Sequence, residues 1–390
     1  MSNYLTLTLL LGLLAIGGDR AVALAVDGLA IDGLAVEQPL FVGTNAKERG
    51  IFASMLNLAT GEFGPAQAVG DAPRPGFLAL HPQLPMLYAV TREKERPSGG
   101  LRAFLIESAT QRATLKLTLV NRQLTGDEGA THLALDPLSK LIVVAHYSGG
   151  STALLPLSDD GSIRPVAILV PHGGTSVHPD RQTEPHAHGV AFDASGQFVC
   201  VADLGTDEVI VYRHRAAEKL ERHTVWKAAP GAGPRHVAFH PNGQWLYCLN
   251  ELNSTMSVLV FDANAGKLTE LQTVDTLPGG FTGPNSTAEV VVHPSGKFVY
   301  GSNRGHDSTA AFSIDADTGR LRLIEVEPTR GGHPRFIGIE PSGKYLIAAN
   351  RDANNLVSFR IDLATGALAP TGHQVSVPQP VCVVFPPATP

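Results

Sequence analysis

A unit of short strands recurs along this chain from about residue 77, and it constrains the fold more than any other feature. Each copy opens with an apolar strand that stops at a proline or a small turn residue. A second strand, a polar loop and two further strands follow. The opening strands are FLALHP (Phe77 to Pro82), HLALDP (His132 to Pro137), GVAFDA (Gly189 to Ala194), HVAFHP (His236 to Pro241), EVVVHP (Glu289 to Pro294) and FIGIEP (Phe336 to Pro341). Strands repeated about every 45 to 57 residues indicate radial repetition, because no single unit can bury its own faces.

The two ends of the chain supply a seventh unit in two pieces. VCVVFP (Val381 to Pro386) is typical of an opening strand with nothing after it, and PLFVGTN (Pro39 to Asn45) of a second strand with nothing before it. Gly50 to Leu58 and the stretch after Gly61 then form the third and fourth strands. Pairing the two ends hides two sheet edges. The sequence therefore predicts an all-β, seven-bladed β-propeller of four-stranded antiparallel blades, closed by its N- and C-terminal strands.

Composition agrees with one such domain over residues 39–390, since each blade buries its faces against its neighbours. Of the 390 residues, 43% are hydrophobic and only 17% charged, and 40 glycines and 28 prolines suit many tight turns. A net charge of −6 argues against a nucleic-acid partner. No apolar run of 18 residues follows residue 16, so no membrane partner is expected for the mature chain. The oligomeric state is not readable, because a closed ring needs no partner.

The N-terminal segment differs from the repeats. Leu5 to Ile16 is a short apolar run, and Ala23-Leu24-Ala25 has the form of a secretory cleavage site. Residues 1–25 are thus expected to be a signal peptide and residues 26–38 a linker, which predicts export to the periplasm or beyond the cell. No Lys or Arg precedes the run, so a membrane-tethered N-terminus and a cytoplasmic protein remain alternatives.

The three cysteines lie inside predicted strands. Cys200 and Cys248 occupy equivalent places in second strands, and Cys382 lies in the closing strand. They are expected to be small buried apolar residues. A disulfide between Cys200 and Cys248 stays open as an alternative.

The connectivity of a four-stranded meander predicts a functional face. Residues just before opening strands and just after second strands lie at one rim of the ring. Polar residues gather at these positions: Pro185-His186-Ala187-His188, Asp203, Gly233-Pro234-Arg235-His236, Asn250-Glu251, Asn303-Arg304, His306-Asp307, His333-Pro334-Arg335 and Asn350-Arg351. A central pocket lined by imidazoles, guanidiniums and carboxylates is therefore expected.

Several of these residue types have structural explanations, since Asn often completes a turn. Turn, solvated or scaffold roles are expected for Asn250, Asn303, Asn350, Arg351, His132 and His240. Arg235, Glu251 and Arg304 differ from the residues at matching places in other blades, and this departure favours a functional role.

Long phrases extend the argument beyond single residues. THLALDP, PDRQTEPHAH, VADLGTDEVIVYR, GAGPRHVAFHPNGQWLYCLNELNSTMSV, NSTAEVVVHPSGKFVYGSNRGHDS and ANRDANNLVSF make the chain, from Pro39 to Phe385, resemble the lactonase family of seven-bladed propellers. That family includes propeller-type bacterial 6-phosphogluconolactonases and fungal 3-carboxy-cis,cis-muconate lactonising enzymes.

The resemblance implies a catalytic His, Arg, Glu, Arg group: His186 or His188 in PHAH, Arg235 in GPRH, Glu251 in NEL and Arg304 in SNRGHDS. Arg335, His236, Asn303 and His306 are expected to bind substrate. The motif HPRF departs from the family, because Phe336 stands where a His is expected.

A lactonase must activate a water and stabilise an oxyanion. Glu251, as first choice, or His186 or His188 would take the proton, and Arg235 and Arg304 would bind anion and oxyanion. No G-x-S-x-G elbow indicates covalent catalysis. If the protein is exported, an unphosphorylated sugar lactone suits it better than a cytosolic sugar phosphate.

The resemblance implies no metal and no cofactor, with a small-molecule lactone as partner. A divalent site formed by His186 and His188 with His172, His178 or His306 is one alternative. The others are a non-catalytic exported binding platform and a muconate-type cycloisomerase.

Overall fold

A computed structural model describes residues 37–46, 50–108, 115–215 and 219–386 of the chain. The expected signal peptide and nearly all of the expected linker lie outside the described residues. The first strand begins at Glu37, two residues before the predicted start of the domain.

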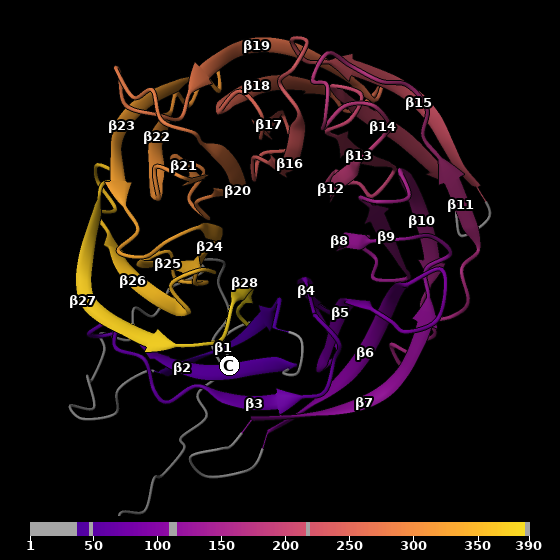
Figure 1. The fold of residues 1–390 in the computed structure, drawn as a ribbon, viewed down its shortest axis with the longest axis horizontal. Coiled ribbons are helices and arrows are strands. Elements are labelled where there is room, and N and C mark those ends of the chain that lie inside the picture. Colours follow the sequence, from indigo (N-terminus) through magenta and orange to yellow (C-terminus); the bar gives the residue numbers. More distant parts are fainter. Residues whose placement is uncertain (1–36, 47–49, 109–114, 216–218, 387–390) are drawn as a thin grey trace, which may run out of the picture. The chain divides into compact units, whose positions relative to one another are not determined.

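The described chain forms 28 strands in seven four-stranded sheets arranged as blades around a ring (Figure 1). Blade 1 holds β4 (Phe77–Leu80), β5 (Met86–Arg92), β6 (Gly99–Ser108) and β7 (Leu115–Leu124). Blade 2 holds β8 (Ala130–Leu135), β9 (Leu141–His146), β10 (Ser151–Pro156) and β11 (Ile168–Pro171). Blade 3 holds β12 (Ala187–Phe192), β13 (Phe198–Asp203), β14 (Glu208–Arg215) and β15 (Lys219–Lys227).

The remaining blades follow the same order. Blade 4 holds β16 (Pro234–Phe239), β17 (Trp245–Asn250), β18 (Thr255–Asp262) and β19 (Lys267–Asp275). Blade 5 holds β20 (Ser286–Val292), β21 (Phe298–Arg304), β22 (Ser308–Ile314) and β23 (Leu321–Pro328). Blade 6 holds β24 (Pro334–Ile339), β25 (Tyr345–Asn350), β26 (Asn355–Ile361) and β27 (Leu368–Ser376). Blade 7 holds β28 (Pro380–Val384), β1 (Glu37–Thr44), β2 (Ile51–Asn57) and β3 (Gln67–Gly70).

Blade 7 closes the ring as the sequence predicts. β28 pairs antiparallel with β1, with Phe41 opposite Val384. The Gln38 side chain adds a hydrogen bond of 2.8 Å to the carbonyl oxygen of Pro386. The predicted seven-bladed, all-β architecture is confirmed, and the two edges that the chain ends would expose are paired with each other.

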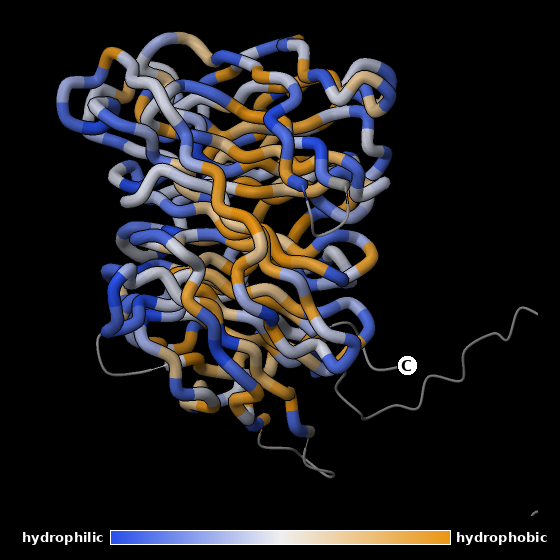
Figure 2. Tube along the Cα trace, turned by 90° about the vertical axis from the view of Figure 1, so that its right-hand side faces the viewer, coloured by the Kyte–Doolittle hydropathy of each residue, from blue (hydrophilic) through white to orange (hydrophobic). Residues whose placement is uncertain are grey.

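The core lies between blades rather than inside any one of them. Six clusters of buried apolar side chains each join consecutive blades. Buried tyrosines on second strands reinforce these contacts: the hydroxyls of Tyr88, Tyr247 and Tyr300 donate to turn carbonyls in the following blade, at Gly161, Gly319 and Gly366, over 2.8, 3.2 and 2.9 Å. In Figure 2 the strands between the two rims are mostly hydrophobic and the loops at the rims mostly hydrophilic.

The cysteines are part of this core. Cys200, Cys248 and Cys382 are all free and buried, so the apolar role is confirmed and the alternative disulfide does not form. Within the described ranges, no helix has the length and apolar character needed to cross a membrane.

The residue before each turn proline explains the recurring HP, DP and EP signals. In blade 2, for example, Asp136 Oδ1 accepts hydrogen bonds from the backbone N–H groups of Lys140 and Leu141 at 2.7 and 2.8 Å. His240 accepts from Asn242 N and also reaches the carbonyl oxygen of Gly296 in the next blade, at 2.8 Å. These side chains satisfy turn backbone groups, which confirms a scaffold role for His240.

The opening strands are innermost (Figure 1). Six of the seven carry a register irregularity near the start. At each irregularity the ladder skips at least one residue of the opening strand. The skipped residues are Thr131, His188, Arg235, Ala288 with Glu289, Arg335 and Val381. The side chain of a residue at a bulge does not follow the regular alternation of side chains between the two faces of the sheet. Three predicted site residues, His188, Arg235 and Arg335, occupy these positions.

Candidate active site

Glu251 is the centre of the polar group predicted at this rim. It follows β17, and its Oε2 lies 2.9 Å from Nε of Arg235 and 3.0 Å from Nη2 of Arg304. Its Oε1 lies 2.8 Å from Nη2 of Arg181, on the long loop before β12. Residues from blades 4 and 5 and from the loop that enters blade 3 therefore meet at one carboxylate.

The charges of this group depend on one another. Burial alone would raise the pKa of Glu251, but Arg304, Arg235 and Arg181 outweigh it and lower that pKa to about 2. Burial, with repulsion from Arg304 and Arg335, lowers the pKa of Arg235. Glu251 is thus ionised at neutral pH, and its negative charge allows two buried guanidiniums to lie side by side.

Backbone carbonyls fix the two guanidiniums from the other side. Nη1 of Arg235 donates to the carbonyl oxygen of Ala288, and Nη2 of Arg304 donates to that of Thr287 at 2.5 Å. Nη2 of Arg235 and Nη1 of Arg304 have no hydrogen-bond partner among the described residues. Each arginine is anchored yet keeps N–H groups for an incoming anion.

Tyr147, just after β9, forms a platform for both imidazoles of the PHAH motif. The His186 ring stacks on the Tyr147 ring with centroids 4.4 Å apart and planes 6° apart, and the His188 ring meets it edge-on at 5.4 Å. The Tyr147 hydroxyl accepts a hydrogen bond from Arg181 Nη2 at 3.0 Å. Through Arg181, the tyrosine connects the imidazoles to Glu251.

The two histidines have different proton arrangements. His186 Nδ1 lies 2.8 Å from the carbonyl oxygen of Tyr147 and must donate to it, so in the neutral form of the ring Nε2 carries the lone pair. That Nε2 has no described partner and, unlike Nδ1 of His188, is not sealed from solvent. Burial and the nearby arginines hold the pKa of His188 well below its ordinary value, so its ring is neutral.

His236 and Glu289 form a buried pair that contacts this group through His188. Nδ1 of His236 lies 3.0 Å from Oε2 of Glu289, and burial raises the pKa of the Glu289 carboxyl. The His236 ring also contacts the rings of His132 and His188, with centroids 4.8 and 5.0 Å away. His236, expected to bind substrate, is therefore buried against His188 and does not line the cavity described below.

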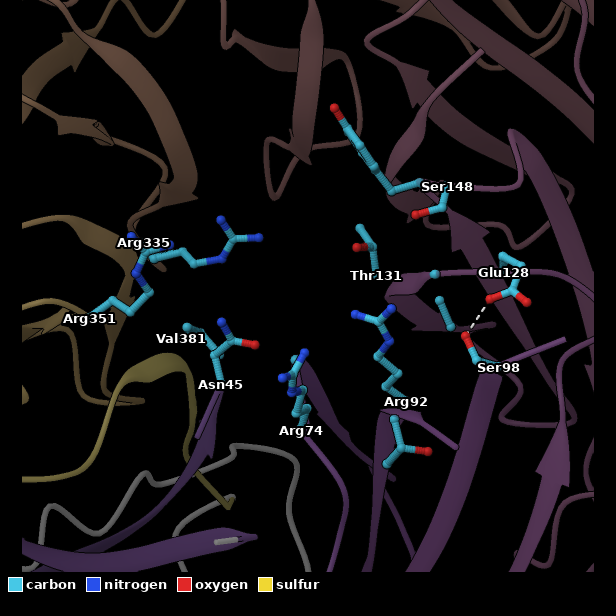
Figure 3. Close-up of a pocket in the computed structure, with 15 residues that line it drawn as sticks. Asn45, Arg74, Arg92, Ser98, Glu128, Thr131, Ser148, Arg335, Arg351 and Val381 are labelled. Atoms are coloured by element: carbon cyan, nitrogen blue, oxygen red, sulfur yellow. Dashed lines mark hydrogen bonds between the residues drawn. The ribbon is translucent and has the colours of Figure 1, made fainter. Parts of the chain in front are cut away.

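An open cavity of about 280 Å³ lies at the same rim (Figure 3). Arg335 and Tyr147 line it, whereas Glu251, Arg235 and Arg304 do not. Arg335 makes no hydrogen bond to a described residue, and its electrostatic interactions reach both Arg304 and Glu251. Burial and repulsion by Arg304 lower the pKa of Arg335 to about 10, so it is still charged at neutral pH. The charged group thus adjoins the cavity through Arg335 and Tyr147.

Two expected substrate-binding residues lie apart from this cavity. Both amide atoms of Asn303 are used by the scaffold: Oδ1 accepts from Thr276 Oγ1 at 2.7 Å, and Nδ2 donates to the Thr276 carbonyl at 2.8 Å. His306 Nδ1 pairs with Ser308 Oγ at 2.8 Å. The turn role considered for Asn303 therefore describes it better than substrate binding.

Sequence reasoning missed several residues of this rim, namely Tyr147, Arg181, Glu289, Arg74 and Arg92. Tyr147 and Arg92 lie at the ends of second strands, and Arg74 precedes an opening strand, so the rule that found Arg235 applies to them also. Arg181 lies in a long loop, whose path no repeat specifies.

The divalent alternative lacks a ligand set in the part of the chain that the structure describes, where no three His, Cys, Asp or Glu side chains are grouped to hold a metal ion. Both ring nitrogens of His172, one proposed ligand, already form hydrogen bonds: Nδ1 lies 2.6 Å from Oδ2 of Asp203, and Nε2 lies 2.9 Å from Oγ1 of Thr152.

Known proteins share both the sequence and the fold. Residues 39–385 match the family model described as "Lactonase, 7-bladed beta-propeller". The chain is 32% identical over 347 residues to the 6-phosphogluconolactonase of Bacillus subtilis, covering 88% of this chain and 97% of that protein. It is 31% identical over 311 residues to the 6-phosphogluconolactonase of Formosa agariphila, covering 77% and 86%. Among solved structures, a periplasmic gluconolactonase of Pseudomonas aeruginosa superposes with a TM-score of 0.84. Its sequence is 29% identical, and the match covers 91% of this chain and all of that one.

Proposed function

Because the chain belongs to the lactonase family of seven-bladed β-propellers and is a lactonase-type hydrolase, we propose that it hydrolyses the ring ester of a sugar lactone at the rim that holds Glu251. The named relatives act on gluconolactone-type substrates, which supports a sugar lactone here. The observation that carries the proposal is the Glu251 group itself: two anchored guanidiniums with unused donors, which Arg181 and Tyr147 connect to an imidazole with a free lone pair.

His186 is the general base of the proposed reaction. Its Nδ1 is held as a donor by the Tyr147 carbonyl, so Nε2 is the atom that accepts the proton of the attacking water. Glu251, the first choice from sequence, suits this role less well, because a carboxylate whose pKa is about 2 is a weak base at neutral pH. Glu251 instead holds the two arginines in place.

Hydrolysis then proceeds without a covalent enzyme intermediate. The water oxygen adds to the lactone carbonyl carbon while His186 takes one proton. Arg235 and Arg304 donate to the oxyanion that develops, an interaction worth about 3 kcal/mol per well-placed donor. When the ring C–O bond breaks, the imidazolium returns its proton to the leaving oxygen, and the product is an open-chain hydroxy acid.

We also propose that the protein is exported. The apolar run Leu5 to Ile16 and the Ala23-Leu24-Ala25 site support this, as does the periplasmic location stated for the Pseudomonas relative. Expression of the full-length chain, followed by fractionation of periplasm and cytosol, tests the proposal; a full-length protein retained in the cytosol would contradict it.

The proposed reaction is tested by lactone hydrolysis with purified protein, corrected for spontaneous ring opening. We expect His186→Gln to lower kcat by roughly 100-fold or more, the usual range for a general base, with KM nearly unchanged. His223→Gln is the matched control, because His223 is exposed on β15 in blade 3. Full activity in His186→Gln would remove His186 from the mechanism, and lack of activity of the wild type on all sugar lactones would refute the function.

A further inference from the structure

Tyr147 contacts both the proposed base and the Glu251 group, yet its hydroxyl takes no part in the mechanism above. Its backbone carbonyl accepts Nδ1–H of His186 at 2.8 Å, and its ring stacks on the His186 ring. Its hydroxyl contacts Arg181, which in turn lies 2.8 Å from Oε1 of Glu251. Tyr147 and Arg335 line the cavity, whereas Glu251 does not. Tyr147 is therefore well placed to meet a molecule that enters there.

The hydroxyl hydrogen of Tyr147 has no acceptor in the described part of the chain. Arg181 contacts the phenol oxygen twice, through Nη2 at 3.0 Å and through Nε at 3.3 Å. A guanidinium carries donors and no acceptor, so the phenol oxygen accepts both hydrogen bonds. An O–H group whose oxygen accepts hydrogen bonds from a cation is also a stronger donor, because linked hydrogen bonds polarise one another. The hydroxyl is thus a strengthened donor that is available to a bound molecule.

The protein fixes both partners of this contact. The ring of Tyr147 lies parallel to the ring of His186, with the two planes 6° apart. Arg181 is followed by Gln182, which is fully buried and whose Nε2 donates to Oδ1 of Asp207 at 2.8 Å. The hydroxyl is therefore positioned before any ligand binds. A donor that is already in place costs no rearrangement when charge develops in a transition state.

Glu251 divides the donors of the site into two sets. Its Oε2 pairs with Arg235 and Arg304, whereas its Oε1 pairs with Arg181, which holds the Tyr147 hydroxyl. A lactone also presents two oxygens on one carbon, namely the carbonyl oxygen and the ring oxygen. The two sets of donors can therefore serve the two oxygens of a single ester group.

We propose that Tyr147 is a catalytic residue, whose hydroxyl donates a hydrogen bond to the ring oxygen of the lactone while Arg235 and Arg304 donate to the carbonyl oxygen. This inference rests on the proposed lactonase function. As the ring C–O bond breaks, its electron pair stays on the ring oxygen, and the hydrogen bond from Tyr147 strengthens with that charge. The ring oxygen then takes its proton from the His186 imidazolium, so Tyr147 keeps its own. Arg181 is a positioning residue, because it acts through the phenol oxygen.

Tyr147→Phe tests the proposal, because it removes the hydroxyl and keeps the ring that stacks on His186. The substrate is D-glucono-δ-lactone or its 6-phosphate, whichever the wild type hydrolyses faster. We expect kcat to fall roughly 10- to 100-fold with KM nearly unchanged, since the hydrogen bond gains its full strength only in the transition state. Tyr247→Phe is the matched control and should keep full activity, because the Tyr247 hydroxyl donates to the Gly319 carbonyl within the scaffold. A loss below about threefold in Tyr147→Phe would overturn the proposal.

A second substrate identifies the oxygen that Tyr147 contacts. The analogue of D-glucono-δ-lactone with sulfur in place of the ring oxygen keeps the carbonyl oxygen, but a thioether-type sulfur is a weak acceptor. Tyr147→Phe should slow hydrolysis of this thiolactone by about threefold or less. Arg304→Lys should slow hydrolysis of both compounds to a similar extent. Equal losses on the two compounds in Tyr147→Phe would assign the hydroxyl to the carbonyl oxygen and would contradict its role at the leaving group.

A double-variant cycle tests the positioning role of Arg181. Without the guanidinium the hydroxyl is no longer oriented, so Tyr147→Phe should lower kcat at least about fivefold less in an Arg181→Gln background than in the wild type. Independent losses that multiply would contradict this role. Thermal unfolding checks that every variant is folded at the assay temperature. A wild type that hydrolyses no sugar lactone would refute the proposed function and this inference with it, whereas an active wild type with a fully active Tyr147→Phe variant refutes the inference alone.

Discussion

Replacing Glu251 by Gln tests the electrostatic reasoning about the site. The change keeps the size of the side chain but leaves Arg235, whose side chain is only 2% exposed, without its carboxylate 2.9 Å away. Removing one partner of a buried ion pair destabilises a protein by about 3–5 kcal/mol, because the remaining charge is buried and uncompensated. We expect Glu251→Gln to lower the free energy of unfolding by about 3 kcal/mol at pH 7.

The pKa of Glu251 gives a second route to this magnitude. At about 1.4 kcal/mol per pKa unit, a carboxyl that changes from 4.5 in the unfolded chain to about 2 in the folded protein contributes about 3 kcal/mol. Since the folded pKa is the lower one, this contribution is present above pH 4.5 and is lost as the pH falls from about 4.5 toward 2. The stability difference between wild type and variant should therefore shrink over that interval.

Urea unfolding at pH 7, 5, 4 and 3, followed by the fluorescence of Trp226 and Trp245, provides the assay. Glu62→Gln is the control, because Glu62 is exposed and its carboxylate has no described partner. A difference at pH 7 below about 1 kcal/mol, or one that stays constant down to pH 3, would refute the view that Glu251 neutralises the buried arginines.

Two further predictions concern the scaffold. Tyr300→Phe should lower stability by about 1 kcal/mol in urea unfolding, because the carbonyl of Gly366 loses its donor; an unchanged midpoint would deny that the hydroxyl ties blade 5 to blade 6. Gly189→Ala should destabilise the protein by about 1–3 kcal/mol and reduce activity, because a Cβ at this position would lie 2.5 Å from the carbonyl oxygen of Arg235. Gly338→Ala is the control, since its nearest atom would lie 3.2 Å from the new Cβ. Similar melting curves for these two glycine variants would argue against close packing of β12 on β16.

The fold was readable from the sequence because its repeats are local. Turn prolines and glycines delimit every blade, and the connectivity of an antiparallel meander determines which strand ends lie at each rim. The closure of β28 on β1 followed from counting an unpaired strand at each end, since a ring leaves no other partner for them. The meeting of Arg235, Glu251 and Arg304 followed from the same connectivity.

The chemistry inside that rim was less readable. Which of Glu251 and His186 acts as base depends on a pKa set by three arginines and on a hydrogen bond to the Tyr147 carbonyl, and neither follows from strand order. Arg181 reaches Glu251 from a loop without a repeat pattern. Asn303 has a position equivalent to Asn250 and Asn350, and only its contacts with Thr276 assign it to the scaffold.

The skipped residues of the innermost strands have an evolutionary consequence. Three of them, Thr131, Arg335 and Val381, line the cavity, whereas Arg235 and His188 also contact neighbouring blades. Thr131, Arg335 and Val381 are thus positions at which a side chain can be exchanged with little effect on the pairing of the strands. Relatives with the same ring can acquire new substrates by altering these few positions, and libraries randomised there are the most direct way to redirect this protein to other esters.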